Sequence, residues 1–271
     1  ETSCADETIS YYKENLTNFF KYCSECFNKP YEEIACTEVT KELFSNYIKY
    51  LRKRPKFQNH PFLDPSDELL SATSIRTYCR SIKVFASFCL ENEYSKDFTK
   101  GVKLPKDDSG EIIPLYESEV KEIDKCCNLK TELGLRNWCI VHLMLDAGLR
   151  SSEVINLRFC DLIFDKNIIQ IWKSKGSKTR LLILCPRLKV NLMKYCVLYR
   201  NYTQLPDHSN VFIQMKNQKP INSNVLKQFF SRLKKKTGIE RVHPHLCRHT
   251  FATAYVIDGG SLEMLRLLLG H

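Results

Sequence analysis

The sequence predicts a mainly α protein of two domains, with a small antiparallel β-sheet or hairpin in the second domain. In the first hundred residues, apolar side chains recur at steps of three and four, which is the spacing of amphipathic helices. Residues 100–114 contain two prolines and two glycines, and they interrupt this pattern without a period of their own. Beyond them, two short apolar runs flank a polar turn, as in a hairpin.

The first domain, residues 1–105, is predicted to contain three helices. They span about 7–27, 40–52 and 73–91, and a proline-containing loop precedes the third. The apolar stripe of the first helix comprises Ile9, Tyr12, Leu16, Phe19, Phe20, Cys23 and Phe27. The stripe of the third helix comprises Ile75, Tyr78, Cys79, Ile82, Phe85, Phe88 and Cys89.

The third helix also carries a basic face opposite its apolar stripe. Arg76, Arg80 and Lys83 lie at i, i+4 and i+7, so they project from one side. Such a face either contacts DNA phosphates or is simply solvated, and the sequence alone leaves both interpretations open.

Residues 106–114 form the predicted linker, and the second domain runs from 115 to 271. It opens with helices, including an apolar one over 136–147. Two strands are predicted at 168–172 and 181–185, joined by a polar turn, after which the pattern returns to helix.

The charge is distributed unevenly between the two domains. The net charge is +10. Residues 1–110 carry 16 Lys and Arg against 17 Asp and Glu, whereas residues 111–271 carry 25 against 14. The excess positive charge of the second domain favours a polyanionic partner, nucleic acid first, although a solvated basic surface would give the same count.

Composition excludes several other classes of protein. The 13 cysteines follow no regular spacing in a chain this long, which is typical of reduced, buried thiols and not of a disulfide framework. The terminus at residues 1–6 is polar, and no apolar run reaches the length of a bilayer span. We therefore expect no membrane span, no secretory signal and a cytoplasmic location.

Three segments of the second domain stand out by their order and spacing. They are AGLRSSEVINL (147–157), KSKGSKTR (173–180) and HPHLCRHTFAT (243–253), with LLGH (268–271) at the end of the sequence. Each alone is a weak signal. Together they resemble the catalytic domain of the tyrosine site-specific recombinases, the phage-integrase and Xer-type enzymes. The helical first domain resembles the core-binding domain of that family, so the expected architecture is a two-domain clamp around DNA.

The resemblance implies a set of catalytic residues and one supporting carboxylate. The catalytic residues it implies are Arg150, Lys175, His245, Arg248 and His271, and the supporting residue is Glu153. Lys173 and Lys178 are expected to contact DNA, and each remains an alternative to Lys175.

These residue types suit phosphoryl transfer to a protein side chain. Two arginines can bind the non-bridging oxygens of a phosphate and stabilise the pentacoordinate transition state. A lysine or histidine can protonate the leaving 5′-oxygen, and a second histidine can assist the attacking hydroxyl. We expect neither a metal nor another cofactor, because the guanidinium groups supply the positive charge.

The nucleophile of the family is a tyrosine about nine residues after the last histidine, so here it is expected near position 280. The 271 residues are thus predicted to lack it, to bind a specific double-stranded recombination site and not to cleave it. The full-length protein is expected to form a homo-tetramer on DNA, weakened in these 271 residues. Whether such a truncation is natural or engineered stays open.

Three alternatives remain at this point. His243, His245, Cys247 and His249 alternate in a way that can indicate zinc, but residues two apart on a helix cannot all converge. A type IB topoisomerase would use a similar pocket without a defined site. A non-catalytic DNA-binding regulator derived from a recombinase would retain the fold alone. Within the leading interpretation, integration, transposition, inversion and chromosome-dimer resolution are not distinguished.

Overall fold

The computed structural model describes residues 6–58, 64–106, 110–172 and 179–270. The chain divides into two compact units, residues 1–111 and 112–271, and each has its own hydrophobic core. The division falls inside the predicted linker, residues 106–114.

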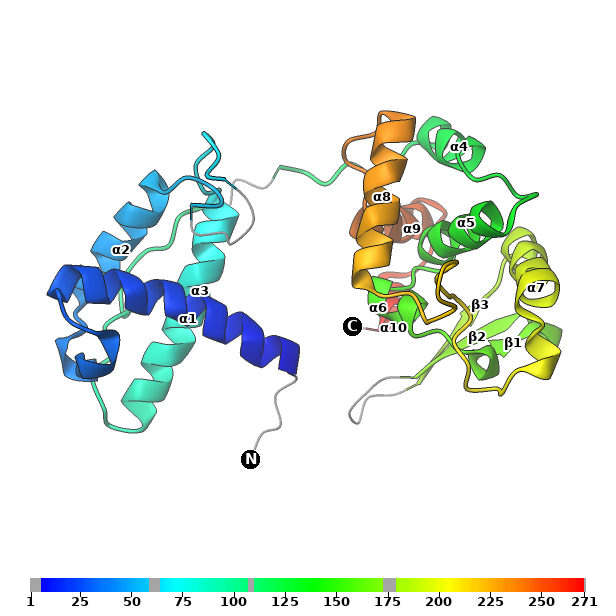
Figure 1. The fold of residues 1–271 in the computed structure, drawn as a ribbon. Helices are drawn as coiled ribbons and strands as arrows, with labels where there is room; N and C mark the ends of the chain where they lie inside the picture. The colour runs from blue at the N-terminus through cyan, green and yellow to red at the C-terminus, as the bar shows by residue number, and fades with distance from the viewer. Residues whose placement is uncertain (1–5, 59–63, 107–109, 173–178, 271) are drawn as a thin grey trace. The chain divides into compact units, whose positions relative to one another are not determined.

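The first unit contains helices α1 (Asp6–Phe27), α2 (Lys41–Lys53) and α3 (Ala72–Glu91) (Figure 1). Two short 3-10 helices, Tyr31–Glu33 and Cys36–Glu38, lie between α1 and α2. The side chain of Thr40 accepts a hydrogen bond from the backbone of Leu43, and Ser71 does the same for Ser74, so hydroxyl caps begin α2 and α3. These bounds confirm the three predicted helices to within two residues.

The apolar stripes of α1 and α3 supply much of the core of this unit. Phe19, Cys23, Ile75, Cys79 and Ile82 are buried. Ile9, however, is 53% exposed and Phe88 is 51% exposed, so these two members of the apolar stripes are not part of the core. Ile9 lies near the start of α1 and Phe88 near the end of α3.

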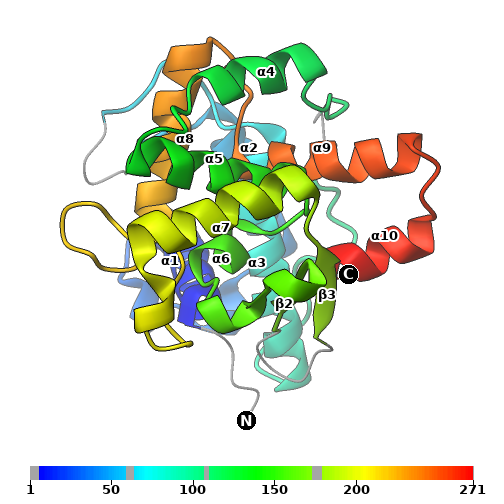
Figure 2. The same cartoon turned by 90° about the vertical axis from the view of Figure 1, so that its right-hand side faces the viewer.

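The second unit contains seven helices within its described residues (Figure 2). They are α4 (Glu117–Lys125), α5 (Glu132–Leu145), α6 (Ser151–Ile155), α7 (Pro186–Arg200), α8 (Ser223–Thr237), α9 (Pro244–Ile257) and α10 (Leu262–Leu269). Three 3-10 helices, Phe159–Asp161, Phe164–Lys166 and Tyr202–Gln204, connect some of these elements. Helix α10 packs beside both α9 and strand β3, as Figure 2 shows.

One antiparallel sheet of order β1-β2-β3 joins this helical framework. Its strands are β1 (Leu162–Ile163), β2 (Ile168–Ile171) and β3 (Arg180–Ile183), with Ile169 opposite both Leu162 and Leu182. The predicted hairpin is thus confirmed, although β3 begins one residue earlier than expected. Strand β1 was not predicted, because two residues cannot display an alternating pattern.

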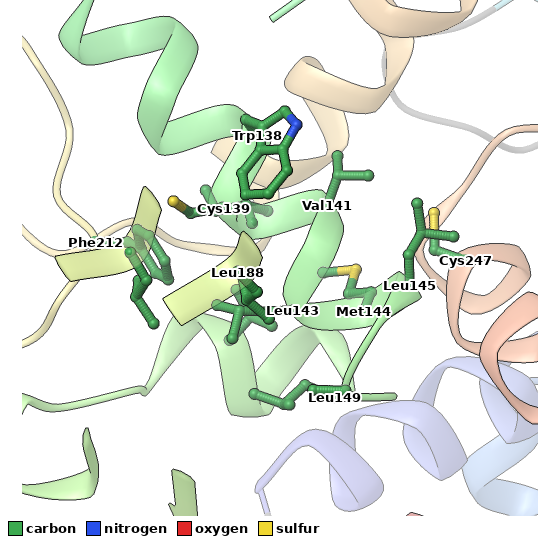
Figure 3. Packing of buried hydrophobic residues seen from close by; sticks show 14 of the residues in the cluster. Trp138, Cys139, Val141, Leu143, Met144, Leu145, Leu149, Leu188, Phe212 and Cys247 are labelled. Carbon is green, nitrogen blue, oxygen red and sulfur yellow. The ribbon is translucent and has the colours of Figure 1, made fainter. Parts of the chain in front are cut away.

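Helix α5 is the centre of the second core. All but three of its fourteen residues are buried, and α7 and α9 pack against it. Figure 3 shows Trp138, Cys139, Val141, Leu143 and Met144 along this helix. A helix that is buried on nearly every side provides a rigid base for the turn that follows it. Among the described residues, no helix combines the length and the apolar character that a bilayer crossing requires.

Candidate functional site

The turn between α5 and α6 places Arg150. Gly148 has a φ of +65°, and a Cβ at this position would lie 2.5 Å from the ring of Phe251 on α9. Both the left-handed conformation and the close approach of α9 therefore require glycine here. Arg150 then takes the N-cap position of α6, and its backbone N–H donates to Glu153 Oε2 at 2.7 Å. The Gly-Leu-Arg-x-x-Glu spacing is thus a turn followed by a capped helix.

Glu153 is the centre of a cluster of three arginines, which we call the Glu153 cluster: Arg150, Glu153, Arg180 and Arg248. Arg150 Nη1 donates to Glu153 Oε1 at 3.1 Å. Arg180 binds both carboxylate oxygens, with Nη1 at 2.8 Å and Nη2 at 2.7 Å. Arg248 Nη1 lies 3.9 Å from Oε2. One carboxylate balances only one of the three cations, so the cluster carries surplus positive charge.

Arg248 is buried beneath the turn and the last helix. Its Nη1 donates to Gly148 O at 2.5 Å and its Nη2 donates to Leu269 O at 2.7 Å. Arg150 Nη2 likewise donates to Gly270 O at 3.2 Å. Both arginines therefore bind carbonyls at the carboxyl end of α10, where the helix dipole favours positive charge.

The pKa values of two members of the cluster reflect this arrangement. Burial favours the neutral form of Arg248, and together with the nearby charge of Arg150 it lowers the pKa of Arg248 to about 10. Burial by itself would raise the pKa of Glu153, but the hydrogen bonds from Arg180 and Arg150 outweigh it and hold this pKa below its usual value. Glu153 and Arg248 are thus both charged at neutral pH, and the surplus of cations persists there.

Of two clefts among the described residues of the second unit, the larger is lined by members of the cluster and the second is not. The larger, of about 890 Å³, is lined by Arg150, Glu153, Trp172 and Gly270 among others. The second, of about 500 Å³, lies between α6, α8 and the start of α9. Its polar lining residues are Ser151, Ser223, Lys227, Ser231, Lys234, His243 and His245. Arg150 and Arg158 line the larger cleft together with the carboxylates Glu153 and Asp161, whereas the second is lined by two lysines and no carboxylate. Cationic side chains of this kind suit an anionic ligand.

The structure brings together three of the predicted site residues, Arg150, Glu153 and Arg248. His245 is exposed in the second cleft, one helical turn before Arg248. Lys173, Lys175, Lys178 and His271 lie outside the described residues. Their described neighbours Trp172 and Gly270 both line the larger cleft.

Arg180 is the residue of the cluster that sequence reasoning missed. In the sequence it ends a polar turn that already contains three lysines, so its charge drew no attention. Its position at the start of a strand, with its side chain directed to a buried carboxylate, becomes visible only in the fold.

The alternating histidines and cysteine do not form a metal site in the described part of the chain. His243 Nδ1 lies 2.6 Å from Arg241 O and His249 Nε2 lies 3.1 Å from Ile112 O, while Cys247 is fully buried. Within the described residues, no three His, Cys, Asp or Glu side chains are placed to hold a metal ion.

The predicted basic face of α3 is not uniform. Arg80 is exposed, whereas Arg76 and Lys83 are half-buried. Arg76 Nη1 donates to Pro105 O at 3.0 Å and so fixes the end of the first unit to α3. Of these three side chains, Arg80 is therefore the most accessible to a partner.

The two-domain helical fold and the paired arginines beside Glu153 define the class of the tyrosine recombinases. A profile described as the phage integrase family matches residues 114–271. The chain belongs to this family.

Curated relatives agree with this assignment. The chain is 28% identical to tyrosine recombinase XerC of Bacillus pumilus (strain SAFR-032) over 271 residues, which cover 97% of this chain and 82% of that protein. It is 29% identical to XerC of Chlamydia muridarum over 210 residues, which cover 74% of this chain and 64% of that protein.

Solved structures show the same fold. The Tn1549 transposon integrase in complex with circular intermediate DNA matches with a TM-score of 0.73 at 16% identity, covering 100% of this chain and 88% of that one. The XerH site-specific recombinase bound to palindromic difH substrate matches with a TM-score of 0.71 at 17% identity, covering 97% and 73%.

Proposed function

We propose that this protein is a site-specific DNA recombinase that cleaves and rejoins strands through a 3′-phosphotyrosine intermediate. The observation that carries the proposal is the convergence of Arg150 and Arg248 on a single carboxylate beside a large open cleft. Two guanidinium groups with surplus positive charge can bind the non-bridging oxygens of the scissile phosphate. They bind most strongly as charge develops in the pentacoordinate transition state.

The remaining steps are assigned to residues around this pair. A tyrosine hydroxyl, expected near position 280, attacks the phosphorus and displaces the 5′-oxygen of the DNA. Lys175 protonates that leaving oxygen, with Lys173 and Lys178 as alternatives, and His245 and His271 assist transfer of the tyrosine proton. Joining the strands of two duplexes requires four such sites, so we expect a homo-tetramer on the DNA site.

DNA binding by the 271 residues tests the electrostatic part of the proposal. Because the surplus positive charge lies in the second unit, the affinity for duplex DNA should fall steeply as salt rises. The measurement is the dissociation constant at several salt concentrations. An affinity that stays constant between low and physiological salt would contradict the proposal.

Adduct formation tests the chemistry. A version extended through the tyrosine near position 280 should form a covalent adduct with a suicide DNA substrate, whereas the 271 residues should not. In the extended version, Arg150→Ala or Arg248→Ala should slow adduct formation by roughly 10²–10³ while much of the DNA binding remains.

Lys175→Ala in the same assay tests the general acid. The variant should be slow on an ordinary substrate and should recover on one with a better leaving group at the 5′-oxygen. Absence of that recovery would assign the role to Lys173 or Lys178. An adduct formed by the 271 residues themselves would mean that another residue is the nucleophile.

A further inference from the structure

Arg180 occupies an unusual position for an arginine. It begins β3, its side chain is 7% exposed, and its guanidinium group binds both oxygens of Glu153. Its Nε is buried and has no hydrogen-bond partner within the described part of the chain. Burying a charged pair, and one N–H without a partner, costs desolvation free energy that an apolar pair would avoid. Stability alone therefore does not account for this arginine.

The charges around Glu153 show what Arg180 contributes. Without it, the charged side chains that face the carboxylate within the described part of the chain would be Arg150, whose Nη1 is 3.1 Å away, and Arg248, whose Nη1 is 3.9 Å away. Glu153 would then neutralise one of these two cations, of which Arg150 lines the larger cleft and Arg248 is buried. With both oxygens bound by Arg180, the negative charge is already balanced. Arg150 and Arg248 keep their own charge for a ligand.

We propose that Arg180 is a positioning residue that neutralises Glu153 and thereby keeps Arg150 and Arg248 available to a phosphate. This inference rests on the proposed function, since it requires the cleft to bind a phosphodiester. It assigns Glu153 a structural task, capping α6 and holding Arg150 through the backbone. Arg180 prevents that carboxylate from weakening the field at the phosphate.

A tetrahedral dianion tests this directly in the 271 residues. Tungstate affinity is measured by titration calorimetry, and thermal melting is the control for folding. The proteins compared are the parent chain, Arg180→Gln, Arg180→Lys, Glu153→Gln and the Arg180→Gln/Glu153→Gln double variant. Arg180→Gln should weaken tungstate binding by about tenfold, because the carboxylate is left uncompensated. Arg180→Lys should recover part of the loss, since it restores the charge without the two-pronged geometry.

The double variant separates this role from a structural one. If Arg180 acts by neutralising Glu153, removing the carboxylate as well should return the affinity to within about twofold of the parent chain. A purely structural role would leave the double variant at least as weak as Arg180→Gln, and that result would overturn the inference. If Arg180→Gln does not fold, the double variant is compared with Glu153→Gln. A clearly lower tungstate affinity of the double variant would then also overturn the inference.

Two further variants keep the inference distinct from the proposed function. Arg158 lines the same cleft as an exposed residue, so Arg158→Gln removes an equal charge, and Glu153→Gln should not rescue it. Rescue of both arginine variants would reduce the effect to net charge and overturn the role of Arg180.

Arg150→Gln should abolish most tungstate binding. If it does not, the phosphate site itself is misplaced, whatever Arg180 does.

Discussion

Among its described residues, the second unit contains two clusters of charged side chains that differ in their balance of charge. The first is the Glu153 cluster, with three arginines and one carboxylate. The second, which we call the His142 cluster, consists of Asp124, His142, Asp146 and Arg187. His142 is 2% exposed and lies between two carboxylates, with Nε2 2.7 Å from Asp124 Oδ1 and Nδ1 2.9 Å from Asp146 Oδ2. Arg187 Nη2 donates to Asp124 Oδ2 at 2.6 Å.

The net charge of each cluster indicates whether it binds a ligand or stabilises the fold. Burial by itself would lower the pKa of His142, but its hydrogen bonds to Asp124 and Asp146 outweigh burial and raise this pKa above its usual value. With the imidazole protonated, two cations meet two anions, and the indole of Trp138 stacks on His142 at 3.9 Å between ring centroids. Such a cluster needs no further ligand. The Glu153 cluster has surplus positive charge beside an open cleft, so an anion completes it.

The largest effect on stability is expected in the His142 cluster. Asp124→Ala removes the acceptor for His142 Nε2 and for Trp138 Nε1, which donates at 2.7 Å. The free energy of unfolding should fall by about 3 kcal/mol, because buried donors lose their partner. Urea unfolding measures it, with the exposed Asp165→Ala as a control that should change stability by less than about 0.5 kcal/mol. Equal losses of stability in the two variants would show that the His142 cluster does not stabilise the fold.

Gly148→Ala should disturb the Glu153 cluster through the backbone of the turn that precedes α6. The φ of +65° and the 2.5 Å approach to Phe251 should together cost about 1–3 kcal/mol of stability and displace the carbonyl that holds Arg248. Gly238→Ala is the matched control, since its φ is +71° but no atom lies within 4 Å of its added Cβ. Thermal unfolding of both variants tests this, and Gly148→Ala should be the less stable. The reverse order would show that the approach of α9 is not tight.

The His142 cluster should also give stability a pH dependence. A raised pKa in the folded state means that the contribution of His142 is fully present below the ordinary histidine pKa of about 6.5. It is then lost as pH rises through the raised value, by about 1.4 kcal/mol for every tenfold difference between the folded and unfolded acid constants. Urea unfolding from pH 6 to 9 should show this decline in the parent chain and a flatter profile in His142→Gln. Parallel profiles would mean that His142 is neutral when folded.

The smallest effects are expected in the first unit, where one arginine is exposed and another is held by a hydrogen bond within the fold. Arg80 is exposed, so Arg80→Ala should reduce the salt slope of DNA binding by about 1 and leave stability unchanged. Arg76 is bound to Pro105 O, so Arg76→Ala should cost about 1 kcal/mol of stability. Unchanged DNA affinity in Arg80→Ala would make this face a solvated one.

The sequence predicted those parts of the site that lie in short ordered motifs. The three helices of the first unit and the hairpin were accessible because periodicity reflects local geometry. The group of Arg150, Glu153 and Arg248 was accessible only through the resemblance of its motifs to the tyrosine recombinases. Residues outside those motifs whose role depends on distant partners were not accessible. Arg180 and Glu153 are 27 positions apart and Asp124 and His142 are 18 apart, and neither pair follows a local pattern.

The sequence also did not predict which apolar residues near the ends of the helices are exposed. Ile9 and Phe88 continue the apolar period of their helices, yet both are about half exposed. Strand β1 was missed because its two residues become a strand only by pairing with β2.

The most direct test of the account compares one variant from each cluster in two measurements. Arg150→Gln should lower tungstate affinity by at least about tenfold while the free energy of unfolding stays within about 1 kcal/mol, because Arg150 is 32% exposed. Asp124→Ala should do the opposite, losing about 3 kcal/mol of stability and keeping its affinity within about twofold. If the parent chain shows no saturable tungstate binding, or if both variants lose affinity and stability together, the surplus charge of the Glu153 cluster is not a phosphate site.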